Sequence, residues 1–330
     1  MTAPDLPGEL TAVLEAKLHG RSRGDAAQRA SAISQAYRAG DSSGAIRTEA
    51  DALAYALARM PATYAAVTAS LNALREARAE FAPADLLDVG AGPGTASWAA
   101  AQALASLRSF SLLDANAAWR RLALDLARGS DRLSVMRYSQ GDAGSSLAEA
   151  PPADLVIASY VINELDDTAR AALADLMWAK TRDTLLVIEP GTPAGTRHIL
   201  TLRRQLIAQG AHVLAPCPHD GECPLAAPDW CHFTQRLPRS RAHKQLKAAE
   251  LPYEDEKFIY VALSRMPAKR RYARVLAQPA TTKIAVTAKL CTAEGIRLTV
   301  APRRDKSAYA RLRKLNWGDA LFEPETSSAE

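Results

Sequence analysis

The chain has 330 residues, of which 48% are hydrophobic, and its 41 basic and 36 acidic side chains give a formal net charge of +5. This length allows two or three units with buried cores, and the apolar content excludes a chain that is disordered throughout. No segment approaches the roughly 18 apolar residues of a membrane span, and the N-terminus does not resemble a signal peptide, so we expect a cytoplasmic monomer without a membrane partner.

The first eighty residues carry alanine and leucine at helical spacing. The pattern predicts three helices, within residues 6–18, 25–40 and 48–81. Thr48, which acids follow, is a suitable start for the third helix, and the glycine-flanked stretch 40–44 separates it from the second. Alanine-rich helices without polar clusters mostly pack, so we interpret this region as a helical cap or platform.

From residue 84 the pattern changes to strands that alternate with helices. The apolar, strand-like segments lie at 85–92, 109–116, 132–142, 153–165 and 183–195. The order β-α-β-α-β predicts a mostly parallel, doubly wound sheet. Ligands of such sheets bind at the carboxyl ends of the strands. A later apolar segment, "EKFIYVALSR" at 256–265, is able to rejoin the sheet.

A glycine-rich loop follows the first expected strand. In "LLDVGAGPGTASWA" the turn is occupied by Asp88, Gly90, Gly92 and Gly94. Glycines allow a tight bend and let a ligand lie against the backbone, although glycines alone also serve packing. Asp114 ends the second strand, where it can accept hydrogen bonds from a ribose. Asp142 ends the third strand, within reach of a base amine.

The acid directly before the glycines distinguishes this loop from an ordinary dinucleotide site. The pattern D-x-G-x-G-x-G, within residues 84–190, resembles the first motif of class I S-adenosylmethionine-dependent methyltransferases. The resemblance implies S-adenosylmethionine as cofactor, with the leading acid and glycines around its methionine part and Asp114 on its ribose. No catalytic base is evident: Asn163 lacks the neighbouring prolines of nucleic-acid amino-methyltransferases, and Asn163 or Asp166 is expected to cap the next helix.

Three of the four cysteines lie within fifteen residues of a proline-broken loop. The four are Cys217, Cys223, Cys231 and Cys291. Disulfides are rare in a reducing compartment, where clustered cysteines more often bind metal. Paired C-x2-C hooks of a zinc ribbon are absent, and four thiolates would suit either Zn²⁺ or an iron–sulfur cluster. His219 and His232 are possible substitute ligands, although such neighbours more often support the ligands.

Four short motifs, "CPHDGECPL", "DWCHFTQR", "KLC" and "RKLNWGD", together resemble one family. It comprises methyltransferase-like small-ribosomal-subunit proteins of bacteria and mitochondria, which act in ribosome assembly. The resemblance implies a [4Fe–4S] cluster on Cys217, Cys223, Cys231 and Cys291, with zinc as the less favoured occupant. It also leaves two functions open: methyl transfer to a base of the ribosomal RNA, or RNA binding and assembly without turnover.

Charge is divided unevenly along the chain. Residues 1–196 hold 18 basic and 23 acidic side chains, whereas residues 197–330 hold 23 and 13. Basic side chains interleaved with Tyr309 and Trp317 suit contact with phosphates and unpaired bases. We therefore expect the basic C-terminal half to bind the small ribosomal subunit through its 16S-type RNA. The basic residues concerned are Arg236, Arg239, Arg241, Lys244, Lys247, Arg303, Arg304, Lys306, Arg311, Arg313 and Lys314.

The expected fold is α/β: a class I methyltransferase (Rossmann-like), doubly wound sheet with helices before it and a small β-rich unit after it. We expect four parts, with boundaries set by these changes of pattern. They are an N-terminal helical region (1–80), a cofactor-binding core (81–200), a cysteine loop with a returning strand (201–265), and a basic β-rich subdomain with a disordered tail (266–330).

Overall fold

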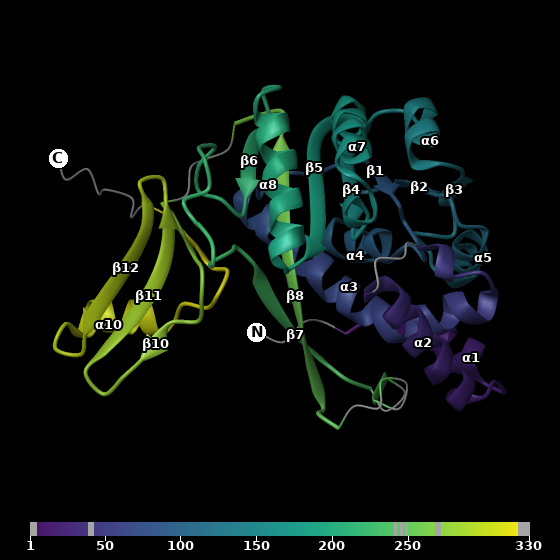
Figure 1. Ribbon diagram of the computed structural model, residues 1–330, viewed down its shortest axis with the longest axis horizontal. Coiled ribbons are helices and arrows are strands. Elements are labelled where there is room, and N and C mark those ends of the chain that lie inside the picture. Colours follow the sequence, from purple (N-terminus) through teal and green to yellow (C-terminus); the bar gives the residue numbers. More distant parts are fainter. Residues whose placement is uncertain are drawn as a thin grey trace.

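The computed structural model describes residues 5–38, 43–240, 243–244, 247, 250–267 and 272–322. The expected break at 40–44 falls partly outside these residues, and Arg241 and the tail at 323–330 fall wholly outside them. The described part forms a large α/β unit and a smaller sheet beside it (Figure 1). Within these residues, no helix has the length and apolarity that crossing a membrane requires.

The large unit is built on an eight-stranded sheet. Its strands are β1 (Asp85–Val89), β2 (Ser109–Asp114), β3 (Arg137–Gln140), β4 (Ala153–Ser159), β5 (Thr181–Pro190), β6 (His212–Ala215), β7 (Phe233–Pro238) and β8 (Tyr253–Ser264). Their order is β3-β2-β1-β4-β5-β8-β6, and β7 also pairs with β8. The strands β1 to β5 are parallel, and β8 runs antiparallel to β5. The predicted fold class is confirmed, and the segment at 256–265 does rejoin the sheet.

Helices cover the large sheet and begin where the sequence provides caps. They are α1 (Gly8–Leu18), α2 (Arg23–Arg38), α3 (Glu49–Ala77), α4 (Thr95–Ala103), α5 (Ala117–Ala127), α6 (Ala143–Glu149), α7 (Asp167–Lys180) and α8 (Pro193–Ile207), with short 3₁₀ turns η1 (Ser43–Ala45) and η2 (Ile162–Glu164). Thr48 starts α3 through a capping box with Asp51, as the sequence predicted: each side chain accepts a hydrogen bond from the other residue's backbone N–H.

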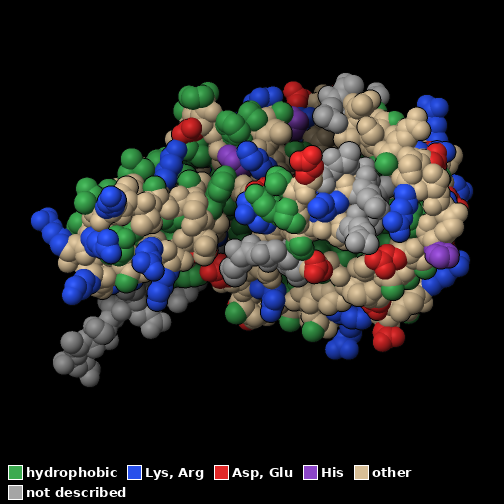
Figure 2. All heavy atoms as spheres, turned by 90° about the horizontal axis from the view of Figure 1, so that it is seen from below, with side chains coloured by type: hydrophobic (Ala, Val, Ile, Leu, Met, Phe, Trp, Pro, Cys, Tyr) green, Lys and Arg blue, Asp and Glu red, His purple; other side chains and the backbone are tan. Residues whose placement is uncertain are grey.

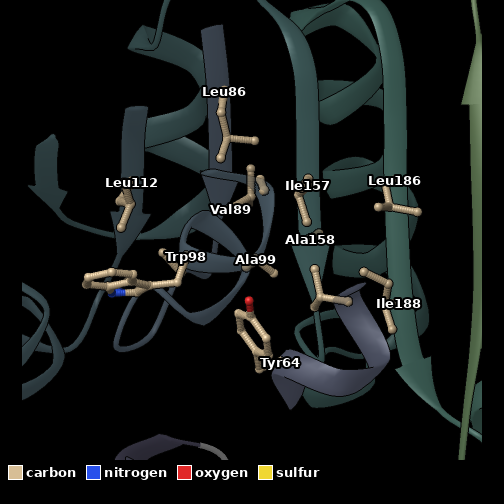
Figure 3. Close-up of a cluster of buried hydrophobic side chains, with 14 of the residues drawn as sticks. Tyr64, Leu86, Val89, Trp98, Ala99, Leu112, Ile157, Ala158, Leu186 and Ile188 are labelled. Atoms are coloured by element: carbon tan, nitrogen blue, oxygen red, sulfur yellow. The ribbon is translucent and has the colours of Figure 1, made fainter. Parts of the chain in front are cut away.

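Helix α3 is part of the core of the large unit. Its 29 residues lie below the sheet, across the carboxyl ends of the parallel strands (Figure 1). Tyr64 of α3 points into the buried cluster formed by β1, β4, β5 and α4, near Val89 and Ala158 (Figure 3). Small alanine side chains let α3 approach the sheet closely, so the N-terminal helices share one continuous hydrophobic core with the strands.

The smaller unit is a five-stranded antiparallel sheet. Its elements are β9 (Ala273–Val275), β10 (Ala280–Thr281), β11 (Ala285–Thr292), β12 (Gly295–Pro302), β13 (Ala320–Leu321) and the helix α10 (Lys306–Arg313). On one face, Ala288 and Leu290 of β11 are buried with Val275, and Leu312 packs against them. Because side chains alternate along a strand, Lys289 and Cys291 point to the opposite face.

The cysteine loop, residues 216–232, joins β6 to β7 and lies between the two sheets (Figure 1). Three contacts fasten it to the smaller unit. The Trp317 indole N–H donates to the His232 carbonyl at 3.0 Å, and Lys289 pairs with Asp229 at 2.7 Å. The Arg274 guanidinium donates through Nε to the Pro216 carbonyl at 2.8 Å.

Candidate functional site

A cavity opens at the carboxyl ends of β1, β2 and β4, where the topology of this fold places ligands. Of the six residues predicted to bind a cofactor, four line it: Gly90, Gly92, Asp114 and Asp142. The topology brings them together because the loops after β1, β2 and β3 all emerge at the same edge of the sheet. That these four bind a cofactor stays a prediction.

The glycine loop is held in shape by its neighbours. Gly90 and Gly92 have φ values of 65° and 54°, in the left-handed region that favours glycine. Asp114 accepts hydrogen bonds from the N–H of Gly92 at 2.9 Å and of Asn116 at 2.8 Å. The Tyr138 hydroxyl donates to the Gly92 carbonyl at 2.8 Å. These contacts fix the loop before any ligand arrives.

The other two predicted residues, Asp88 and Gly94, lie behind the loop rather than in the cavity wall. Asp88 is fully buried, and its Oδ2 accepts hydrogen bonds from the N–H and the hydroxyl of Ser97, at 3.1 and 2.7 Å. Gly94 is the N-cap residue of α4 with φ 81°. Both residues therefore shape the turn into α4. Asp142 lines the cavity and also caps α6, accepting from Gly144 and Ser145.

Burial raises the pKa of Asp88 to about 7; the hydrogen bonds from Ser97 oppose this rise and nearby Asp114 adds to it. Since the unfolded pKa is about 3.9, the folded protein holds the proton between about pH 4 and pH 7, and stability should fall as pH rises through that window. The measurement is the free energy of unfolding of the cofactor-free protein in urea, as a function of pH. Asp88→Asn should reduce its slope between about pH 4 and pH 7 by up to about 1.4 kcal/mol per pH unit.

Glu189 provides the matched comparison for this experiment, because burial also raises its pKa to about 7. Glu189→Gln should therefore flatten the same part of the pH profile, and the double variant should flatten it further. A profile with the wild-type slope in Asp88→Asn would show that the Asp88 carboxyl is ionised throughout this range.

Several cavity residues were not found from the sequence. Tyr55 and Thr63 come from α3, Trp119 from α5, and Tyr160 and Val161 from the turn after β4. No local pattern marks the α3 residues, because only the tertiary fold lays α3 over the strand ends. Among the described residues, Tyr160 is the one non-glycine with positive φ, at 61°. The aromatic residue directly after the fourth strand was the only feature of the sequence that could have indicated any of these cavity residues.

The side chains after β4 are engaged in structural contacts. The Tyr160 hydroxyl donates to Glu256 at 2.9 Å, and Glu256 pairs with Arg59 at 3.0 Å. Asp166 accepts from the Ala169 N–H and caps α7, as the sequence predicted. Asn163 lies against the buried carboxyl of Glu189. These contacts do not supply a base that is aimed at a methyl acceptor.

All four cysteines line a second cavity, between α8, the cysteine loop and the smaller sheet. None of them is in a disulfide. Cys291 Sγ lies 3.8 Å from His219 Nε2, so His219 neighbours the thiols as expected. Burial raises the pKa of Cys217 and Cys231, and of Cys291 to about 12, and the adjacent cysteines add to the rise.

The chemistry of this donor set fits a metal–thiolate group. The thiols of Cys217, Cys231 and Cys291, whose pKa is raised, stay neutral on their own, and a metal cation stabilises the thiolate form. Zn²⁺ needs all its sulfur ligands about 2.3 Å from one point. In the described part of the chain, no three His, Cys, Asp or Glu side chains converge in this way on a single ion. The thiols surround a space instead.

Nine of the predicted basic residues fall into two groups, and half-buried Lys244 belongs to neither. Arg236, Arg239 and Lys247 are paired with acids of β8: Arg236 with Asp255, and the other two with Glu254. The second group is exposed, and no carboxylate of the described residues lies within ion-pair distance of it. It consists of Arg303, Arg304, Lys306, Arg311, Arg313 and Lys314. Figure 2 shows basic side chains gathered at the end of the molecule that holds the smaller sheet.

The strand order with an antiparallel β8, together with the glycine loop at the end of β1, defines a class I methyltransferase fold. The chain belongs to the family described as "Mitochondrial small ribosomal subunit Rsm22", whose model matches residues 49–322. The match extends from the start of α3 to the last described residue. It confirms the family that the cysteine motifs indicated.

Two relatives illustrate this membership. The human "Ribosome assembly protein METTL17, mitochondrial" is 29% identical over 83% of this chain and 63% of its own length. The "Rsm22-cox11 tandem protein 2, mitochondrial" of Schizosaccharomyces pombe is 24% identical over 84% of this chain and 44% of its own. The chain thus spans less than two thirds of each relative. Both names specify mitochondria, whereas a cytoplasmic location stays a prediction for this chain.

Among solved structures, the magnesium protoporphyrin IX methyltransferase of Synechocystis with bound S-adenosylmethionine aligns with 79% of this chain and 98% of its own. The identity is 11% and the TM-score 0.41. At this level of similarity the fold assignment depends on the strand order itself.

Proposed function

We propose that this protein binds RNA of the small ribosomal subunit through its C-terminal unit and acts in assembly of that subunit. The observation that carries the proposal is the group of six exposed basic side chains, on and beside α10, that pair with no acid of the described residues. Free cations on one surface attract phosphates, whereas those paired with Glu254 and Asp255 are already compensated. The family and the name of the human relative support the same partner.

We further propose that the cavity at the strand ends binds S-adenosylmethionine. Gly90 and Gly92 would leave room for the cofactor against the backbone, Asp114 would hold the ribose, and Asp142 would face the base. Asp88 and Gly94 would act indirectly, by fixing the turn that shapes the loop. When bound, this cofactor supplies an activated methyl group.

We propose a [4Fe–4S] cluster on Cys217, Cys223, Cys231 and Cys291. Four thiols around one cavity support a metal–thiolate group, and the resemblance of the cysteine motifs favours the cluster over Zn²⁺. The protein's part would be to hold the cysteine loop against β11, which carries Cys291. The cluster would thereby fasten the basic C-terminal unit to the methyltransferase fold.

The assembly role is tested in a strain that lacks this protein. Small-subunit precursors should accumulate there, and the wild-type gene should restore mature subunits. The triple variant Arg304→Gln/Lys306→Gln/Arg313→Gln should restore them poorly, because it removes three free positive charges. Arg236→Gln is the matched control and should restore them, since Arg236 is already paired with Asp255. Full rescue by the triple variant would contradict this interface.

Methyl transfer is the second candidate, favoured by a cavity in which the glycine loop and Asp114 are in place. Mapping methyl groups on ribosomal RNA from the same strain separates the two functions. If the strain lacks one methyl group and the purified protein methylates that same position, the protein is a methyltransferase. Accumulated precursors with every methyl group retained would establish an assembly factor. The contacts of Tyr160 and Asn163 lead us to expect the second result.

A further inference from the structure

Two arginines line the cysteine cavity from opposite sides: Arg203 of α8 and Arg274 of β9. Their exposed fractions are only 4% and 2%. Among the described residues, neither guanidinium has a carboxylate within ion-pair distance. Burying a cation without a counter-charge costs several kcal/mol. Two such cations on one cavity therefore require an explanation.

Backbone carbonyls orient both guanidinium groups. Arg203 Nη2 donates to the His219 carbonyl at 2.7 Å. Arg274 donates through Nε to Pro216 at 2.8 Å and through Nη1 to the Gly318 carbonyl at 2.6 Å. Carbonyl oxygens satisfy these donors but carry no full charge. The contacts therefore explain how the arginines are held and leave their positive charges uncompensated.

One nitrogen of each arginine remains without an acceptor. Arg203 Nε and Arg274 Nη2 are both buried and without a hydrogen-bond partner among the described residues. Unpaired buried donors are rare in folded proteins and often mark a missing ligand. Since both side chains line the cavity of the cysteines, an acceptor in that cavity would satisfy them.

We infer that Arg203 and Arg274 compensate the charge of the group bound by the four cysteines. This inference depends on the cluster proposed above. An oxidised [4Fe–4S] core carries two positive charges and four thiolates carry four negative ones, so two negative charges remain. Two arginines balance them. Their unpaired N–H groups are donors for the cluster or its thiolates, an interaction that sets cluster potentials.

The competing explanation is purely structural: the arginines only hold carbonyls of the cysteine loop and of Gly318. A neutral donor would do that equally well, so the experiment must measure charge. Reduction adds an electron to an already negative group, and nearby positive charge favours the reduced form. Loss of one arginine should therefore shift the reduction potential to more negative values.

The experiment compares Arg203→Met, Arg203→Lys, Arg274→Met and Arg274→Lys in the full chain, purified without oxygen. Each loaded protein is titrated electrochemically. Both Met variants should have a more negative potential than the wild type, and both Lys variants should retain most of the wild-type value. Arg204→Met is the matched control, since Arg204 follows Arg203 on α8 but pairs with exposed Glu222. Loaded Met variants with the wild-type potential would overturn the inference.

A second measurement covers variants that hold no cluster. Urea unfolding of the metal-free proteins should find Arg203→Met at least as stable as the wild type, because an unpaired buried charge has been removed. The loaded wild type should gain more stability from its cluster than the loaded variant does. If the arginine were merely structural, its replacement would destabilise the metal-free form and the loaded form equally. This result would overturn the inference. If the wild-type protein never acquires iron, the cluster proposal fails, and the arginine inference fails with it. If the wild-type protein binds the cluster but the potentials do not shift, only the arginine inference fails.

Discussion

Replacement of Cys291 by serine is expected to abolish stable binding of the cluster. Wild-type protein purified without oxygen should be brown and contain about four iron and four sulfide ions per chain, whereas Cys291→Ser should lose most of both. Cys291 is the one proposed ligand on the smaller sheet, and the other three proposed ligands lie on the cysteine loop. Its loss should also weaken the attachment of the smaller unit to that loop, which would then depend on contacts such as those of Arg274 and Trp317.

The stability cost can be gauged from chain topology. A link between Cys231 and Cys291 closes a loop of about sixty residues, and a cross-link of that span stabilises by about 4 kcal/mol. The free energy of unfolding in urea should fall by an amount of this order. Lys289→Met is the control: it lies on the same strand and face, and its exposed pair with Asp229 contributes no more than about 1 kcal/mol.

Two outcomes would contradict this prediction. Stoichiometric zinc without iron in the wild-type protein would show that the four cysteines bind zinc and not a cluster. A Cys291→Ser protein with full iron and sulfide would remove Cys291 from the ligand set, leaving His219, 3.8 Å away, as the side chain to test next.

Replacement of Gly90 by alanine is expected to damage both stability and cofactor binding. The φ of 65° costs alanine about 1–2 kcal/mol. The added Cβ would lie 2.9 Å from Val161 Cγ1 and closer still to Cγ2, an overpacking that costs about 1–3 kcal/mol more. Calorimetric titration with S-adenosylmethionine should show an affinity at least tenfold lower, because each 1.4 kcal/mol is a factor of ten.

Two further variants separate the causes. Gly210→Ala carries a similar backbone strain, with φ 87°, but its Cβ would meet nothing within 4 Å and Gly210 does not line the cavity. It should lose some stability and keep cofactor affinity. The double variant Gly90→Ala/Val161→Ala should recover the steric part of the loss. A Gly90→Ala protein with wild-type affinity would show that the cofactor does not depend on this loop.

Local patterns in the sequence determined much of the fold. Apolar strands alternating with helices gave the parallel sheet, and Thr48 with its acids gave the start of α3. Gly90, Gly92, Asp114 and the cysteines were recognisable because their chemistry and spacing are written in consecutive residues. The family followed from such short motifs.

The tertiary structure decided which distant residues share a site. Position 88 appears in the motif next to the glycines, yet its side chain is buried and binds Ser97, because α4 packs back against β1 after the glycine loop. Tyr55 reaches the cavity at the strand ends only because α3 folds across them. Arg203 and Arg274 are ordinary basic residues in the sequence. Their burial beside the cysteines depends on how the fold places α8 and β9 around one cavity, which no local pattern encodes.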